Sequence, residues 1–119
     1  MINKNELKKK YKETLPPMGV YQIKNLKNGK VFIGSSKNLP GKENSTFFQL
    51  KMGSYYIKEL QQDYKESGAD NFVFEVLDYL EPKEGTDYNY TKDLEALEEL
   101  WLEKLKPYGD RGYNKYKSK

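Results

Sequence analysis

Two short runs of β-prone residues surround an Asn-Gly pair in the first third of the chain. The runs are centred on residues 20–23 and 31–33, with Asn28 and Gly29 between them. Asparagine and glycine tolerate the positive φ angles that a tight hairpin turn requires. The pattern therefore predicts two antiparallel strands, and their pairing brings Tyr21 close to the second strand.

A third strand is predicted over residues 72–80, where apolar side chains fall on both faces. Phe72, Phe74 and Val76 share one face, while Val73 and Leu77 lie on the other. Apolar residues on both faces indicate a sheet that is covered on both sides.

Helices are predicted from apolar spacing and from residues typical of helix ends. The expected segments are a helix capped by Asn3 that stops before Pro16, a short helix over residues 47–52 that ends at Gly53, a helix capped by Ser54 that continues to about residue 66, and a helix over residues 92–106 that stops at Pro107. Residues 37–44 contain a proline and a glycine, so they are expected to form a loop or a broken helix start.

The chain of 119 residues is long enough for one domain with a modest core. We expect a basic helical extension over residues 1–17, a domain over residues 18–114 and a flexible tail over residues 115–119. No apolar run is long enough for a membrane span or a signal peptide. The lack of cysteine fits a reducing compartment, so an intracellular, cytoplasmic protein is expected.

The composition excludes several kinds of catalysis. The chain has no cysteine and no histidine, which removes thiol nucleophiles, zinc sites with the usual ligands, and histidine-based triads. Acid–base chemistry would have to use tyrosine, lysine, aspartate or glutamate.

Charge is distributed unevenly along the chain. Residues 1–51 hold 11 lysines against 3 acidic residues, whereas residues 52–119 are net acidic. A basic first half suits a polyanionic partner, although a solvated lysine-rich surface explains it equally well. Lysine lacks the planar guanidinium with which arginine binds two phosphate oxygens at once. The chain has a single arginine, Arg111, which is a candidate to supply such a group to a phosphate.

One glutamate interrupts the apolar stripe of the last predicted helix. Leu94, Leu97, Trp101 and Leu105 make that stripe, and Glu98 lies inside it. A carboxylate turned toward a core is costly unless it is paired, hydrogen-bonded or bound to a metal. Glu98 is therefore either a rim residue, a partner for a lysine of the basic half, or a carboxylate aimed at a catalytic surface.

Together these segments resemble the GIY-YIG nuclease superfamily over about residues 18–114. The resemblance is carried by Gly19-Val20-Tyr21, by the run from Phe32 to Leu39 (Phe-Ile-Gly-Ser-Ser-Lys-Asn-Leu), by the helix from Leu94 to Leu102, and by Pro107 with Gly112-Tyr113-Asn114. It implies an α/β (α+β) fold in which a small three-stranded antiparallel sheet is flanked by helices.

The resemblance also implies hydrolysis of a phosphodiester with Mg²⁺ or Mn²⁺. In that scheme Tyr21 activates water and Glu98 holds the metal. A nearby lysine or a metal-bound hydroxide would have to lower the pKa of Tyr21, and proximity across the hairpin makes Lys30 a candidate. The family's second tyrosine and an arginine contact the phosphate, at the positions that hold Phe32 and the candidate catalytic residue Lys42 in this chain, and Asn114 helps fix the site. We also expect Gly34, Ser35, Asn38, Arg111 and Asn114 to belong to the surface that binds phosphate or nucleic acid.

This chain departs from the family pattern at three positions. Phe32 replaces the second tyrosine and loses its hydroxyl, Lys42 replaces the arginine, and Thr46 replaces a frequent histidine. Three functions are therefore compatible with the residues and the resemblance. The first is an endonuclease that acts on nucleic acid, with DNA expected over RNA. The second is a non-catalytic descendant that binds nucleic acid or a nucleotide, and the third is an adaptor for a protein partner that the sequence does not identify.

Overall fold

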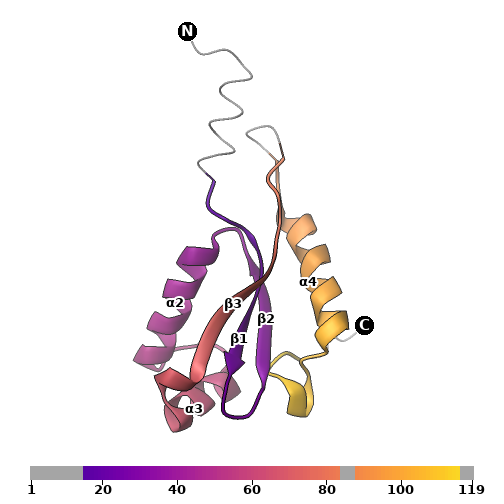
Figure 1. Ribbon diagram of the computed structural model, residues 1–119. Coiled ribbons are helices and arrows are strands. Elements are labelled where there is room, and N and C mark those ends of the chain that lie inside the picture. Colours follow the sequence, from indigo (N-terminus) through magenta and orange to yellow (C-terminus); the bar gives the residue numbers. More distant parts are fainter. Residues whose placement is uncertain (1–14, 84–87, 116–119) are drawn as a thin grey trace.

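The computed structural model describes residues 15–83 and 88–115, which form a three-stranded antiparallel sheet between helices (Figure 1). The strands are β1 (Gly19–Asn25), β2 (Val31–Ser36) and β3 (Phe72–Tyr79), in the order β2-β1-β3. The helices are α2 (Leu39–Met52), α3 (Lys58–Ser67) and α4 (Thr91–Leu105), with short 3-10 turns at η1 (Ala69–Asn71) and η2 (Gly109–Arg111). The predicted fold class is confirmed.

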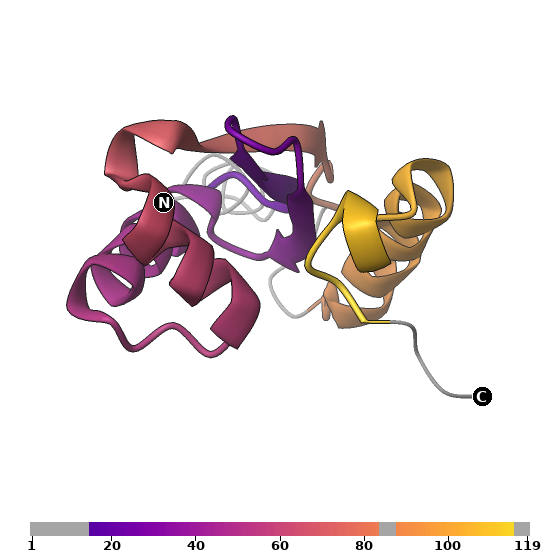
Figure 2. The same cartoon turned by 90° about the horizontal axis from the view of Figure 1, so that it is seen from below.

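Helices cover both faces of the sheet, as the apolar pattern of β3 predicted. Helices α2 and α3 lie on one side, and α4 lies on the other (Figures 1 and 2). Side chains alternate along each strand, so neighbouring residues enter different cores. The core toward α2 and α3 contains Tyr21, Ile23, Phe32, Leu39, Leu50, Tyr55, Leu60, Phe72 and Tyr113. The core toward α4 contains Val20, Ile33 and Leu102, with Leu77, Leu97, Trp101 and Leu105 packed against them.

Strand β2 forms an edge of the sheet, because β1 pairs with β2 on one side and with β3 on the other. Tyr21 is opposite Gly34, and Val20 is opposite Ser35. Near the chain's carboxyl-terminal end, the Tyr113 N–H donates to the Val31 carbonyl at 2.9 Å. Backbone groups of alternate residues point the same way in an antiparallel strand. The N–H and C=O of Ser35 therefore also point toward this outer edge.

The hairpin turn is wider than the predicted two-residue Asn-Gly turn. It is closed by a hydrogen bond from Asn25 N–H to the Lys30 carbonyl at 2.9 Å. Gly29 takes a positive φ of 80°, whereas Asn28 does not. The Asn28 side chain instead accepts a hydrogen bond from Lys30 N–H at 2.9 Å, and this contact fixes the wider loop.

Two predicted helix starts are wrong. Residues 39–44 belong to α2, because Asn38 Oδ1 caps the helix by accepting from Gly41 N–H, and proline is tolerated in a first turn. Helix α3 begins at Lys58 rather than at Ser54. The Ser54 N–H bonds back to the Gln49 carbonyl, so this residue belongs to the end of α2.

The predicted last helix is confirmed within a residue at each end. Helix α4 runs from Thr91 to Leu105, and Lys106 follows it in the left-handed conformation before Pro107. The predicted first helix and residues 116–119 of the predicted tail lie outside the described residues. Within 15–83 and 88–115, none of the helices has both the length and the apolar character needed to cross a bilayer.

Candidate active site

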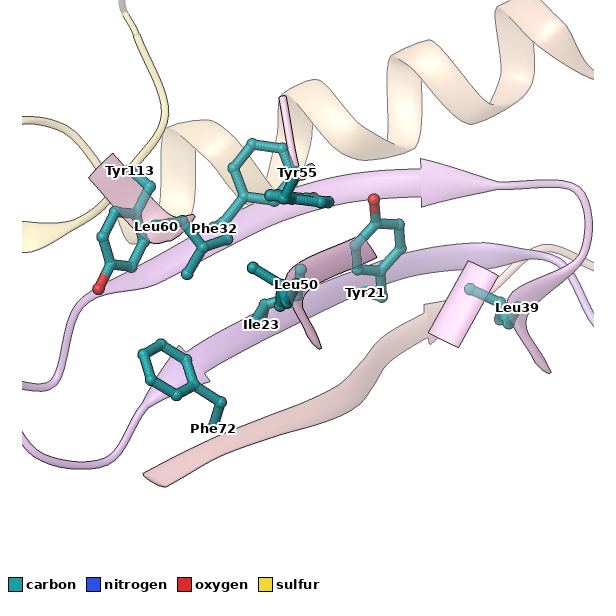
Figure 3. Close-up of a cluster of buried hydrophobic side chains, with 9 residues drawn as sticks. All are labelled: Tyr21, Ile23, Phe32, Leu39, Leu50, Tyr55, Leu60, Phe72 and Tyr113. Carbon is teal, nitrogen blue, oxygen red and sulfur yellow. The ribbon is translucent and has the colours of Figure 1, made fainter. Parts of the chain in front are cut away.

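Tyr21 lies over Gly34 at the edge of the sheet. Its side chain is only 2% exposed, and its ring stacks on Phe74 with centroids 4.7 Å apart. A Cβ atom built on Gly34 would lie 2.5 Å from the Tyr21 hydroxyl oxygen. Only glycine leaves room for the phenol here. Figure 3 shows Tyr21 in the cluster that includes Phe32 and Tyr55.

Glu98 approaches the same strand from the opposite face. It projects from α4, is half-buried, and its Oε1 accepts a hydrogen bond from Ser35 Oγ at 3.0 Å. Gly34 and Ser35 are consecutive residues of the edge strand, so their side-chain positions face opposite sides of the sheet. The phenol of Tyr21 and the carboxylate of Glu98 therefore reach one edge from opposite faces.

Within residues 15–83 and 88–115, Glu98 forms no ion pair with a lysine. Among the residues that the structure describes, the ion pairs are Lys30 with Glu59 and Lys106 with Glu103. The hydrogen bond to Ser35 compensates part of the cost of turning Glu98 toward the apolar core. Ser35 binds one of the two carboxylate oxygens, and a carboxylate can accept through the other as well.

The environment of Tyr21 keeps its phenol protonated. Burial raises the pKa of Tyr21 well above the ordinary value, and the neighbouring Tyr55, Tyr56 and Glu98 raise it further. At neutral pH this side chain is a neutral hydrogen-bonding group and not a phenolate. A group that lowers its pKa would have to come with the ligand.

Lys30 is not the predicted helper of Tyr21. Its ammonium is bound to the Glu59 carboxylate and lies 5.6 Å from the ring centroid of Tyr113. Lys30 precedes Gly34, the partner of Tyr21, by four residues. An extended strand rises roughly 3.3 Å per residue, so these positions are separated by about 13 Å. Sharing a hairpin with Tyr21 therefore does not bring Lys30 to its hydroxyl.

Asn38 and Lys42 belong to the first turns of α2. The Asn38 carboxamide caps the helix, so its function here is to define where α2 begins. Lys42 lies on the same helical face as the buried Leu39 and Thr46 and is half-buried itself. Within the described part of the chain, the Lys42 ammonium forms no ion pair. It is therefore available to an anion. Thr46 is also buried, with 1% of its surface exposed.

Phe32 is buried, and Tyr56, which is not among the predicted site residues, packs against it. The ring of Tyr56 meets Phe32 edge to face, with centroids 6.4 Å apart, and Tyr55 is 5.0 Å from Tyr56. Both tyrosines lie in the connection between α2 and α3, which was predicted to be helical. The sequence feature that could have pointed to Tyr56 is the pair of adjacent tyrosines that follows Gly53 and Ser54.

Asn114 holds the edge strand in place through its side chain. Its Oδ1 accepts from Ile33 N–H and its Nδ2 donates to the Ile33 carbonyl, both at 2.9 Å. These bonds occupy the carboxamide, so Asn114 positions β2 instead of facing the substrate. Arg111 is exposed and lines a separate pocket with Asn28 and Leu105. Leu105 is about 10 Å along α4 from Glu98, so the structure does not bring Arg111 to the site.

A groove of about 940 Å³ extends from Phe32 and Tyr56 along the start of α3. Its other residues are Ile57, Lys58, Glu59, Tyr108, Gly109, Gly112, Tyr113, Asn114 and Lys115. It shares Phe32 and Tyr56 with the surroundings of Tyr21. The groove therefore lies beside Phe32 of β2, between the start of α3 and the segment that follows α4.

The carboxylate at this site suits a metal ion that takes most of its ligands from water and substrate. Among the described residues, no group of three or more acidic, histidine or cysteine side chains gathers at one point. Mg²⁺ is often bound through one or two carboxylates, with water and phosphate as further ligands. Glu98, with one oxygen oriented by Ser35, meets this requirement.

Comparison with known proteins agrees with this geometry. The profile of the GIY-YIG catalytic domain matches residues 17–116. The chain belongs to this family. Nucleases of the GIY-YIG family are generally metal-dependent.

Individual relatives of this GIY-YIG domain are similar over most of the chain. It is 34% identical over 88 residues to intron-associated endonuclease 1 of Enterobacteria phage T4, which is 73% of this chain. The match spans about a third, 32%, of the phage protein. Among solved structures, the catalytic domain of the homing endonuclease I-TevI is 27% identical, with a TM-score of 0.67 over 84% of this chain and 99% of that one. A point mutant of the same domain is 28% identical, with a TM-score of 0.67 over 82% and 92%.

Proposed function

We propose that this GIY-YIG domain is a metal-dependent endonuclease that hydrolyses phosphodiesters in DNA. The observation that carries the proposal is the approach of Tyr21 and Glu98 to one edge of the sheet across Gly34 and Ser35. The matched relatives are endonucleases and their catalytic domains, which favours a nuclease over a non-catalytic binding module.

Each residue of the site has a defined part in this proposal. The neutral Tyr21 hydroxyl accepts a hydrogen bond from the attacking water and orients it toward phosphorus. The Lys42 ammonium attracts the phosphate as a point charge, without the bidentate grip of an arginine. Ser35 orients the Glu98 carboxylate, and Asn114 holds the strand that carries Ser35.

Glu98 is the residue that would hold the metal, Mg²⁺ or Mn²⁺. When bound, such an ion supplies Lewis-acid charge to the phosphate oxygens. Because Ser35 already binds one carboxylate oxygen, the orientation of Glu98 is fixed before a metal arrives. A fixed ligand loses less conformational freedom on binding.

Cleavage of a labelled panel of DNA and RNA substrates with Mg²⁺ or Mn²⁺ tests the proposal. We expect metal-dependent cutting of DNA, which Glu98→Gln abolishes and Tyr21→Phe lowers by roughly 10²–10³-fold. Absence of metal-dependent cutting over the panel would contradict the endonuclease proposal. Salt-sensitive binding without turnover would instead support the alternative binding module.

Two lysine variants provide a matched comparison within the same assay. Lys42→Met removes the ammonium of α2 and should lower the cleavage rate by roughly tenfold or more, because a charge-assisted contact to phosphate is lost. Lys30→Met removes a lysine that is bound to Glu59 instead. It should leave the cleavage rate near that of the wild type, because Lys30 is not part of the site. Its loss should not unfold the protein either, since an exposed ion pair contributes little to stability. Equal rates for the two variants would remove Lys42 from the site.

A further inference from the structure

Tyr56 occupies the space in front of Phe32, the position at which this chain lacks a hydroxyl. The two rings meet edge to face at 6.4 Å and an interplanar angle of 86°. Phe32 itself is buried, whereas the Tyr56 side chain is 64% exposed. A substrate at the β2 edge can therefore reach the phenol of Tyr56 without displacing core residues.

The connection that carries Tyr56 is anchored at the end of α2. The Gln61 side chain accepts from Tyr55 N–H at 2.9 Å and donates to the Leu50 carbonyl at 3.0 Å. The buried ring of Tyr55 also packs against Tyr56 at 5.0 Å. These contacts position an exposed aromatic side chain that would otherwise sample several rotamers.

Tyr56 also lies within electrostatic range of the site. Partial burial raises the pKa of Tyr56, a hydrogen bond with Tyr55 lowers it, and the negative charge of Glu98 raises it. Tyr56 in turn contributes to the raised pKa of Tyr21. The phenol is therefore a neutral hydrogen-bond donor at physiological pH, and Tyr56 is one of the residues that line the groove.

We propose that Tyr56 is a substrate-contacting residue whose hydroxyl donates to an oxygen of the scissile phosphate, replacing the hydroxyl that Phe32 lacks. This inference rests on the proposed nuclease function. It assigns to the loop between α2 and α3 a contact that the β2 strand cannot make. The ring of Tyr56 packs against Phe32, and its hydroxyl is the group that can donate a hydrogen bond to phosphate.

Three variants test the assignment by cleavage kinetics and by binding of the same labelled DNA with Ca²⁺ in place of Mg²⁺. Tyr56→Phe keeps the ring and should lower kcat by roughly 10²-fold and weaken DNA binding by roughly tenfold, with an unchanged melting temperature. Tyr79→Phe, on a tyrosine of β3 that is 60% exposed, should change none of these values. Phe32→Tyr combined with Tyr56→Phe should recover at least part of both losses, because it returns a hydroxyl to the neighbouring ring.

The two readouts separate this inference from the proposed function. If the wild type cuts no substrate, the nuclease proposal fails, and the binding measurement still decides the contribution of Tyr56. If Tyr56→Phe binds DNA and cuts it as the wild type and Tyr79→Phe do, the Tyr56 assignment is overturned while the nuclease proposal stands.

Discussion

Replacing Gly34 by alanine should disrupt both packing and catalysis through Tyr21. The added Cβ would lie 2.5 Å from the Tyr21 hydroxyl oxygen and 2.7 Å from its Cζ. Ordinary contacts between such atoms begin at about 3.4 Å, so the ring or the strand must move by about 1 Å. Tyr21 is almost fully buried and stacked on Phe74, which leaves it little room to move.

The expected size of the effect follows from this displacement. Overpacking of a core by one methyl group typically costs about 1–3 kcal/mol of stability. A 1 Å misplacement of a group that orients a reactant can lower the rate by about 10²-fold. We therefore expect Gly34→Ala to lose about 1–3 kcal/mol in urea unfolding and about two orders of magnitude in DNA cleavage.

A double-mutant cycle with Tyr21→Phe identifies the cause. Removing the hydroxyl relieves the closest contact, so Gly34→Ala should cost less stability in the Tyr21→Phe background than in the wild type. The measurement is the free energy of unfolding of the four proteins by urea titration. The packing of Tyr21 over Gly34 would be refuted if Gly34→Ala had the stability and cleavage rate of the wild type. It would also be refuted if the losses in unfolding free energy of the two single variants added up to that of the double variant.

Three further predictions concern the support of the site. Ser35→Ala frees the carboxylate of Glu98, so the Mg²⁺ concentration for half-maximal cleavage should rise several-fold; an unchanged metal requirement would remove Ser35 from this function. Asn114→Asp loses the amide that donates to the β2 backbone, and urea unfolding should show a loss of about 1–3 kcal/mol that the exposed-site control Asn44→Asp does not show. Burial raises the pKa of Tyr113 to about 12, whereas a phenol in the unfolded chain ionises near ~10. The unfolded chain therefore loses this proton first, and the urea midpoint should fall between about pH 10 and 12; a constant midpoint would contradict the burial of this hydroxyl.

The features that sequence predicted correctly are those encoded by local periodicity. The position of Glu98 inside an apolar stripe depends only on helical spacing, and the structure places it against Ser35 as a half-buried carboxylate. The closeness of Tyr21 to the second strand follows from pairing two neighbouring strands, and the structure places it opposite Gly34. Both relations connect residues whose geometry is set by one regular element or one hairpin.

The features that sequence missed depend on contacts between distant segments. Tyr56 packs against Phe32 because the α2–α3 connection returns to the sheet, and no periodicity in residues 53–58 reveals that path. Asn114 is bound to Ile33, and this pairing is set by how the chain after α4 returns to β2. The sequence predicts Lys30 beside Tyr21, but strand geometry separates the two and Lys30 binds Glu59. It also predicts that Asn38 binds phosphate, whereas the Asn38 carboxamide caps α2.

The central claim is that a metal binds at the β2 edge through Glu98, beside Tyr21. The most direct measurement is an anomalous difference map from crystals of the protein soaked with Mn²⁺ and a short DNA duplex. We predict one manganese peak at bonding distance from the Glu98 carboxylate, with a phosphate oxygen among its other ligands and the Tyr21 hydroxyl facing the same phosphate. A manganese ion bound elsewhere, or a duplex bound away from the β2 edge, would contradict the account.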